Sequence, residues 1–119
     1  MHCSFSVAQY DELPIIYAHG DLDMATCPEL GDLATTLIDQ AQPRLIVDVL
    51  DVAYTEASAI DALVELHNKI ESRGGKLAVV CGDLQVKRLI ESVQVDREPA
   101  VFDDRDSAAA YLSGLPAAN

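Results

Sequence analysis

The run RLIVDVLDV, residues 44–52, is the most apolar stretch of the chain and decides its fold. Its compact, β-branched composition is typical of a strand that helices cover on at least one face. Helical patterns flank it, made by Leu30, Leu33, Ala34, Leu37, Ile38 and Ala41 before it and by Ile60, Leu63, Val64, His67 and Ile70 after it. We therefore interpret residues 44–52 as the central strand of an α/β domain.

Shorter segments with strand composition complete the sheet. Residues 3–7 alternate between apolar and polar side chains, and YDELP, residues 10–14, supplies a turn. IIYAHG, residues 15–20, follows as a second strand that ends at its glycine, so the pair predicts an antiparallel hairpin. KLAVVC, residues 76–81, and AVF, residues 100–102, are predicted as the later strands.

Three helix ends are also predicted from local sequence. The helix after the central strand ends at SRGG, residues 72–75, with glycine as a left-handed cap. A third amphipathic helix begins near Asp83 and carries Val86, Leu89, Ile90 and Val93. DSAAAYLSGLP, residues 106–116, is predicted as the last helix, with Asp106 as its N-cap.

Strands and helices thus alternate in the order β-β-α-β-α-β-α-β-α. This order predicts a mixed, mainly parallel sheet with right-handed crossovers, an N-terminal antiparallel hairpin at its edge and about four helices. The length of 119 residues fits one domain. We expect it to span residues 1–115, with a flexible end at residues 116–119.

The charge of the chain restricts its partners. Twenty acidic residues against eight basic ones give a net charge of −12. The phosphates of nucleic acids and of anionic membranes would repel such a surface. A basic or metal-bearing partner is favoured instead.

Composition also indicates the compartment. No basic segment leads into an apolar stretch at the N-terminus, and no run approaches the roughly 18 apolar residues of a membrane helix, so a cytoplasmic protein is expected. Cys3, Cys27 and Cys81 are odd in number and widely spaced, which argues against a disulfide framework and a zinc site. We expect buried, reduced thiols, with exposure of Cys3 left open.

Two hydroxyl residues are interpreted as helix caps. Thr26 has capping-box spacing to Glu29, and Pro28 lies in the first turn. Ser58, three residues before Asp61, is interpreted as the cap of the next helix. A hydroxyl at a helix start is also suited to phosphorylation, because the N-terminus of the helix stabilises added negative charge.

Acidic residues and histidines offer weaker candidates for a site. A magnesium pocket would need the convergence of Asp21, Asp23, Asp48, Asp51 and Glu56. Asp48, however, lies within the central strand, and the others are equally explained as solvated loop residues. His67 in an apolar stripe and His19 at a strand end lack a second ligand at metal spacing and are interpreted as structural. Lys87 and Arg88 are interpreted as part of a solvated face.

Four segments resemble the STAS domain of bacterial anti-sigma factor antagonists. GDLDMAT, residues 20–26, resembles the G-E-L-D-x-x-T motif after the second strand. LIVDVLDVAYTEASAI, residues 45–60, resembles the strand, loop and helix start whose loop usually reads D-S-S-G-L or D-S-T-G-L. GGKLAVVC, residues 74–81, and VKRLIESVQV, residues 86–95, resemble the following strand and the V-K-R-L-F-x-x-S-G-L helix. Together these segments span nearly the whole chain in order.

The resemblance implies a partner and a switch. In that family an anti-sigma factor, itself a serine kinase, phosphorylates the first serine of the loop, and only the unphosphorylated antagonist binds it and frees the sigma factor. By position, Glu56 stands where the family has the loop aspartate, and Ala57 stands where it has the phosphorylated serine. Ser58 takes the place of the second Ser/Thr, and Ala59 takes the place of the glycine. The implied docking surface is Asp21, Asp23, Thr26, Glu56, Ala57, Ser58 and Ala59, with neither catalysis nor a cofactor.

Ala57 departs from the family at the decisive atom. It has no hydroxyl, so the usual phosphoserine switch is absent. Phosphorylation of Ser58 instead stays open, and Thr55 is a weaker candidate. The oligomeric state is not predicted.

Two other functions remain as alternatives. STAS modules also serve as adaptors in stress-signalling and transporter complexes. A receiver-like domain would use Asp48 or Asp51 as a phosphoacceptor, with Asp21 and Asp23 holding magnesium. A stand-alone enzyme is disfavoured because the sequence offers no nucleophile and base pair.

Overall fold

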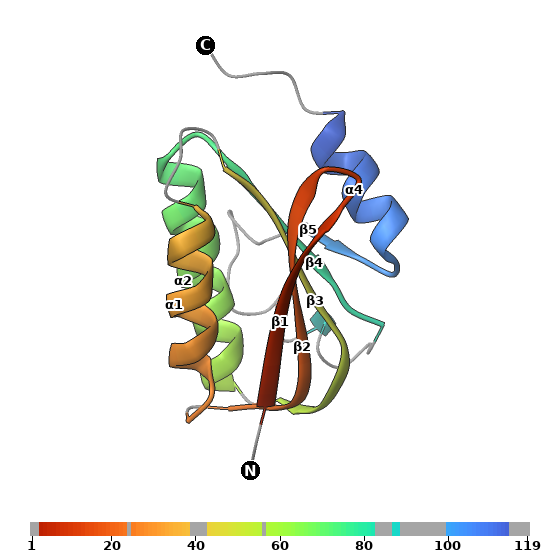
Figure 1. Cartoon of the computed structure of the whole chain (residues 1–119). Coiled ribbons are helices and arrows are strands. Elements are labelled where there is room, and N and C mark those ends of the chain that lie inside the picture. The colour runs from red at the N-terminus through yellow and green to blue at the C-terminus, as the bar shows by residue number, and fades with distance from the viewer. Residues whose placement is uncertain are drawn as a thin grey trace.

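The computed structural model of the chain describes residues 3–23, 25–38, 43–55, 57–82, 87–88 and 100–114. These residues form three layers, with α1 and α2 on one face of a five-stranded sheet and α4 on the other (Figure 1). The elements in chain order are β1 (Cys3–Tyr10), β2 (Leu13–Leu22), α1 (Cys27–Leu37), β3 (Arg44–Thr55), α2 (Ala57–Ser72), β4 (Lys76–Val80), β5 (Ala100–Phe102) and α4 (Arg105–Ser113).

The sheet has the predicted mixed topology. Its strand order is β1-β2-β3-β4-β5, so β3 is central and the hairpin forms one edge. The β1–β2 pair is antiparallel, and the other pairs are parallel. The hairpin turns at Asp11 and Glu12, whose φ angles of 52° and 68° are those of a type I′ turn. The predicted hairpin and central strand are therefore confirmed.

Burial on both faces of the sheet explains why β3 is apolar almost throughout. Val47 and Val49 pack with α1 and α2 in one core cluster, whereas Ile46 packs with α4 in a second cluster. A strand that alternates between two cores needs apolar residues at successive positions. The run that predicted the central strand is thus the consequence of a helix layer on each side.

Several element ends differ from the prediction. β2 continues past Gly20 to Leu22, because Gly20, with φ of 114°, lies at an irregularity of the β2–β3 ladder rather than at its end. β3 continues to Thr55. The cap of α4 is Asp104, whose Oδ1 accepts from the backbone N–H of Ser107 at 2.7 Å.

The predicted N-cap of the last helix, Asp106, therefore has another role. It lies in the first turn of α4 and accepts a hydrogen bond from the hydroxyl of Tyr10. This bond raises the pKa of Tyr10 to about 12. Asp106 thereby ties the hairpin end of β1 to the helix on the far face of the sheet.

Between β4 and β5 the structure describes residues 81–82 and 87–88. Of the predicted third helix, the positions Val86, Leu89, Ile90 and Val93 lie outside the described residues, whereas Lys87 and Arg88 are helical. Lys87 forms an ion pair with Asp103, so it is more than a solvated surface residue. About four helices were predicted, and the described residues contain three complete ones.

The thiols and His67 lie mostly inside the protein. Cys3 and Cys81 are buried, so the open question of Cys3 is answered, and Cys27 is half-buried. Burial raises the pKa of the Cys3 thiol. His67 is buried on α2 with its Nε2 3.6 Å from Oε1 of Glu71. Within the described ranges, no helix has the length and apolar character needed to span a membrane.

Candidate functional site

The C-terminal ends of the neighbouring strands β2 and β3 bring together two segments that are distant in sequence. The strands are parallel, and Asp21 pairs with Tyr54 while Leu22 pairs with Thr55. After these strand ends, β2 leads into α1 and β3 leads into α2, and the two helices pack on the same face of the sheet (Figure 1). The segments GDLDMAT and YTEASAI therefore lie side by side.

Asp23 and Thr26 hold the first of these segments in shape. Oδ1 of Asp23 accepts from the backbone N–H of Ala25 at 2.9 Å and of Thr26 at 3.1 Å. In return, Oγ1 of Thr26 accepts from the backbone N–H of Asp23 at 2.9 Å. This reciprocal pair is a capping box three residues earlier than the predicted one between Thr26 and Glu29. Thr26 is the N-cap residue of α1 and Pro28 lies in its first turn, as predicted, but the Thr26 side chain makes no cap bond to α1, so the predicted capping box with Glu29 is wrong.

The hydroxyl of Thr26 also ties the loop to the sheet. It donates to the backbone carbonyl of Asp21 at 2.9 Å, and the residue is only 9 % exposed. Asp23 and Thr26 therefore shape the loop more than they present atoms to solvent. Of the predicted residues in this segment, Asp21 is half-buried at the end of β2.

Thr26→Val should lower the free energy of unfolding by about 1–3 kcal/mol, because it leaves two partly buried backbone groups, the N–H of Asp23 and the carbonyl of Asp21, without this hydrogen bond. Urea unfolding would measure the change. Thr35→Val is the matched control, since its exposed hydroxyl bonds only the Gly31 carbonyl within α1. Equal effects of the two substitutions would contradict the assigned role of Thr26.

The second segment enters α2 earlier than predicted. The helix begins at Ala57, so Ser58 lies inside the first turn and is not its cap. Glu56 lies outside the described residues. Ala59, in the first turn of α2, is fully buried in the core cluster between the helices and the sheet. The hydroxyl oxygen of Thr55 is buried without a hydrogen bond in the described part of the chain, which disfavours it as a phosphoacceptor.

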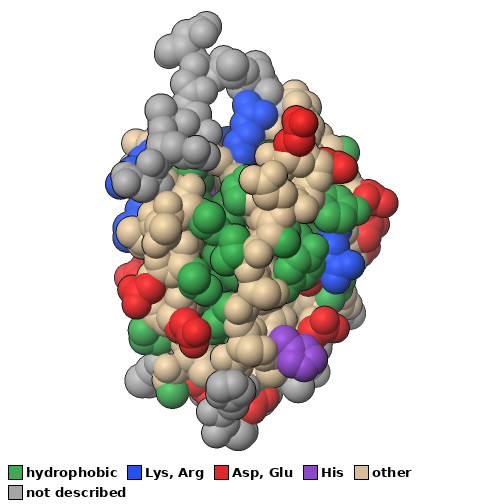
Figure 2. Space-filling model, viewed as in Figure 1, with side chains coloured by type: hydrophobic (Ala, Val, Ile, Leu, Met, Phe, Trp, Pro, Cys, Tyr) green, Lys and Arg blue, Asp and Glu red, His purple; other side chains and the backbone are tan. Residues whose placement is uncertain are grey.

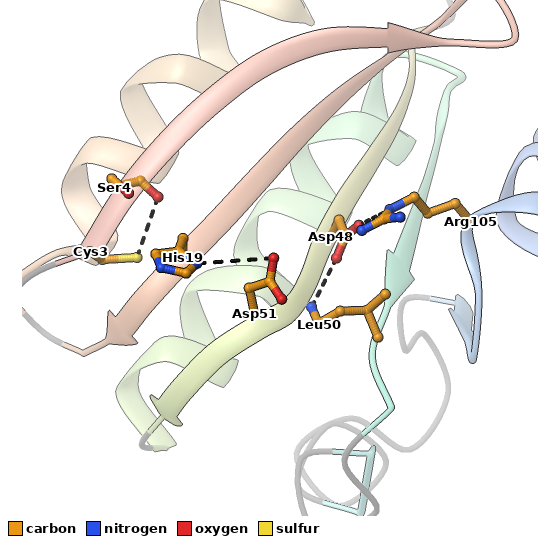
Figure 3. A network of polar contacts seen from close by, with 7 residues as sticks. All are labelled: Cys3, Ser4, His19, Asp48, Leu50, Asp51 and Arg105. Atoms are coloured by element: carbon orange, nitrogen blue, oxygen red, sulfur yellow. Dashed lines mark hydrogen bonds and ion pairs between the residues drawn. The ribbon is translucent and has the colours of Figure 1, made fainter.

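Asp48 is separated from the other acidic residues. Its Oδ2 accepts from Nε of Arg105 at the start of α4, and its Oδ1 accepts from the backbone N–H of Leu50 at 2.9 Å (Figure 3). Asp51 instead faces His19, 4.0 Å away, with both side chains exposed. No three described carboxylates, histidines or cysteines converge, so the alternative of a magnesium pocket gains no geometric support from them.

The partner of Asp48 was missed from the sequence. Arg105 follows Asp48 by 57 residues, and its guanidinium also lies 5.2 Å from the ring centre of Tyr17. The signal was a charged residue inside an otherwise apolar strand, which requires a partner of opposite charge. Because Arg105 engages its carboxylate, Asp48 is a poor acceptor for the receiver-like alternative.

An open groove of about 710 Å³ runs between α1 and α2. Its lining includes Cys27, Pro28 and Gly31 from α1 and Ala62, Glu65 and Lys69 from α2. A Cβ added at Gly31 would meet nothing within 4 Å, so small residues leave this space open. The groove begins at the first turn of α1, beside the paired strand ends.

Comparison with protein families matches residues 4–108 to the STAS domain. Among solved structures, an anti-sigma factor antagonist from Mycobacterium paratuberculosis is 20 % identical, with a TM-score of 0.81 over 94 % of this chain and 95 % of that one. The anti-sigma factor antagonist SpoIIAA in its unphosphorylated form is 15 % identical, with a TM-score of 0.75 over 94 % and 100 %.

A larger protein contains a similar domain. The murine anion transporter Slc26a9 is 16 % identical, with a TM-score of 0.73 over 95 % of this chain but only 22 % of the transporter chain. At these identities the likeness concerns the fold. No curated protein matches the chain.

Proposed function

The chain belongs to the STAS domain family, and we propose that it is a cytoplasmic anti-sigma factor antagonist without a phosphorylation switch at residue 57. It binds a kinase-type anti-sigma factor and thereby releases a sigma factor. The observation that carries the proposal is the position of Ala57 as the first residue of α2, next to the paired ends of β2 and β3. There the family resemblance expects a phosphorylated serine.

The partner would meet an acidic edge. Asp21 lies near the end of β2, and Asp61 and Glu65 occupy exposed positions about one and two turns after the start of α2. The chain also has a net charge of −12, so a basic surface on the partner is favoured. The start of α2 at Ala57 is the centre of the proposed surface, with Ala59 buried beneath it, while Asp23 and Thr26 hold the adjoining loop in place.

Absence of the switch makes binding independent of the kinase activity of the partner. A phosphoryl group at the start of α2 would add about −1.5 to −2 charge next to carboxylates. In the usual switch this charge ends binding. A methyl group at the same position leaves the acidic edge unchanged when ATP is present, so release of the sigma factor depends on the concentrations of the two proteins.

Incubation with a kinase-type anti-sigma factor from the source organism and ATP tests the proposal. We expect a stable complex and no added phosphate in the intact mass of the chain. Ala57→Ser should gain one phosphate and, once modified, bind at least tenfold more weakly, about 1.4 kcal/mol. Its unmodified form, measured without ATP, is the control for the substitution itself.

Two outcomes would contradict the proposal in different ways. Stoichiometric phosphate on the unchanged chain would contradict the missing switch, and its loss in Ser58→Ala would assign it to Ser58. Failure to bind any anti-sigma factor would favour the adaptor alternative. The occurrence of this fold as one part of a transporter chain motivates that alternative, and the mass of a co-purified partner would discriminate the two.

A further inference from the structure

The outer side of β1 is an open sheet edge without the usual protection. β1 is the first strand in the sheet order, and in the described part of the chain only β2 pairs with it. Natural edge strands are commonly protected by charges, proline or bulges. CSFSVAQY contains no charge and no proline, and its pairing with β2 is regular.

The surface around this edge resembles an interface. β1 runs down the front of the molecule in Figure 1, and Figure 2 shows hydrophobic side chains gathered in the middle of that face, with acidic ones toward its rim. Val7, near the middle of β1, is 46 % exposed, the highest value among the described large hydrophobic residues. An apolar centre with a polar rim is typical of a protein interface.

From these features we propose that β1 pairs antiparallel with β1 of a second copy, so that two sheets join into one across a twofold axis. The hairpin determines which backbone groups are available. Tyr10 and Leu13 close a two-residue type I′ turn and therefore form a hydrogen-bonded pair. Because such pairs alternate along an antiparallel ladder, Ser4, Ser6, Ala8 and Tyr10 direct their N–H and C=O groups toward β2. The free groups are those of Cys3, Phe5, Val7 and Gln9.

A second copy of β1 can match every free group. With the twofold axis at Ser6, Phe5 lies opposite Val7 of the second copy, and Cys3 lies opposite Gln9. Each of these residues directs its backbone outward, so all of them find partners. The register also places an aromatic side chain across from a β-branched one, an arrangement that stabilises antiparallel sheets.

Acidic groups lie near both ends of β1 and limit the strength of this pairing. Asp11 and Glu12 form the turn at one end, and Asp21 and Asp23 lie near Cys3 at the other end. With the axis at Ser6, antiparallel pairing places the two turns about 35 Å apart, beyond the Debye length of about 10 Å at 0.1 M salt. Each turn instead faces the Cys3 end of the second copy, where Asp21 and Asp23 lie. The remaining repulsion between chains of charge −12 predicts a weak dimer that salt strengthens.

Sedimentation of the full chain from about 5 to about 500 μM tests the dimer, since one strand edge is smaller than a standard stable interface. We expect dimerisation to increase with concentration and with salt. Val7→Lys should weaken it at least tenfold, because a lysine ammonium is placed at the paired edge. Leu50→Lys is the matched control, since Leu50 is a 38 % exposed hydrophobic residue on β3 and changes by the same charge.

Amide hydrogen exchange followed by NMR identifies the surface. At high concentration the amides of Phe5, Val7 and Gln9 should gain protection, while those of Ser6 and Ala8 stay unchanged because they already bond β2. A monomer throughout the concentration range would overturn the proposal. Equal dimerisation of Val7→Lys and wild type, or protection without this alternation, would overturn it as well.

Discussion

Replacing Arg105 with methionine is expected to lower the free energy of unfolding by about 2–4 kcal/mol, one of the largest effects available from a single side chain. The side chain of Asp48 is only 3 % exposed, and Arg105 is its cation. Removal of the guanidinium leaves a buried carboxylate without a compensating charge. The expected cost is below that of a fully enclosed pair because Arg105 is itself 37 % exposed.

Asp48→Asn should be milder, at about 1 kcal/mol. Its side-chain oxygen still accepts from the backbone N–H of Leu50, and the guanidinium of Arg105 can turn toward water. Removing the cation is therefore expected to cost more than removing the anion. The asymmetry follows from burial, since only the anion lies inside the protein.

A double-mutant cycle separates this pair from general damage at the two positions. Once Asp48→Asn has removed the carboxylate, the further change Arg105→Met should cost little, which gives a coupling of about 2 kcal/mol. Urea unfolding of the four proteins measures it. Additive effects would show that Arg105 acts through its contact with Tyr17 or its place in α4, not through Asp48.

Local sequence was sufficient to predict the main elements of this fold. The apolar run at residues 44–52 was correctly placed at the centre of the sheet, because burial on both faces leaves a direct signal in composition. The ends were less predictable. β2 and β3 extend further than predicted because their last residues pair with each other, Asp21 with Tyr54 and Leu22 with Thr55. Such a pairing partner is not visible in the local sequence.

The hydrogen bonds at two helix starts were misassigned for a related reason, although Thr26 is the N-cap residue of α1 as predicted. The segment around Asp23, Thr26 and Glu29 contains two overlapping capping-box spacings, and the choice between them depends on the backbone leaving β2. Asp104 and Asp106 compete in the same way at α4. Several polar residues satisfied the local rule in each case, and the tertiary structure selected one.

The candidate site was predictable as two segments but not as a surface. The resemblance identified the residues around Asp21 and Ala57, and the parallel pairing of β2 and β3 explains why they meet. It did not reveal that Thr26 is almost buried and Ala59 completely so. Side-chain direction at a helix start depends on where the first turn begins, and here α2 begins at Ala57.

Gly75→Ala is expected to lower the free energy of unfolding by more than about 3 kcal/mol or to prevent folding at 25 °C. A Cβ at residue 75 would lie 1.9 Å from the backbone oxygen of Pro43. That oxygen cannot withdraw easily, because it accepts from the backbone N–H of Lys76 at 2.9 Å where the β3–β4 pairing begins. The clash therefore acts on the central pair of parallel strands.

The two adjacent glycines should respond differently for distinct reasons. Gly74 has φ of 77°, the predicted left-handed cap, so Gly74→Ala should cost about 1–2 kcal/mol in backbone strain. The constraint on Gly75 is steric and comes from a residue that is distant in sequence. Local sequence predicted the first constraint and was silent on the second.

Gly31→Ala supplies the matched control, with the same added methyl group in open space. Gly31 lies within α1, and its added Cβ would meet nothing within 4 Å, so the substitution should raise the free energy of unfolding by about 0.5–1 kcal/mol through helix propensity. Urea or thermal unfolding of the three alanine variants should therefore give opposite signs at residues 31 and 75. A cost below about 1 kcal/mol at Gly75 would mean that the β3–β4 connection can move away from the methyl group, contrary to the tight contact with Pro43.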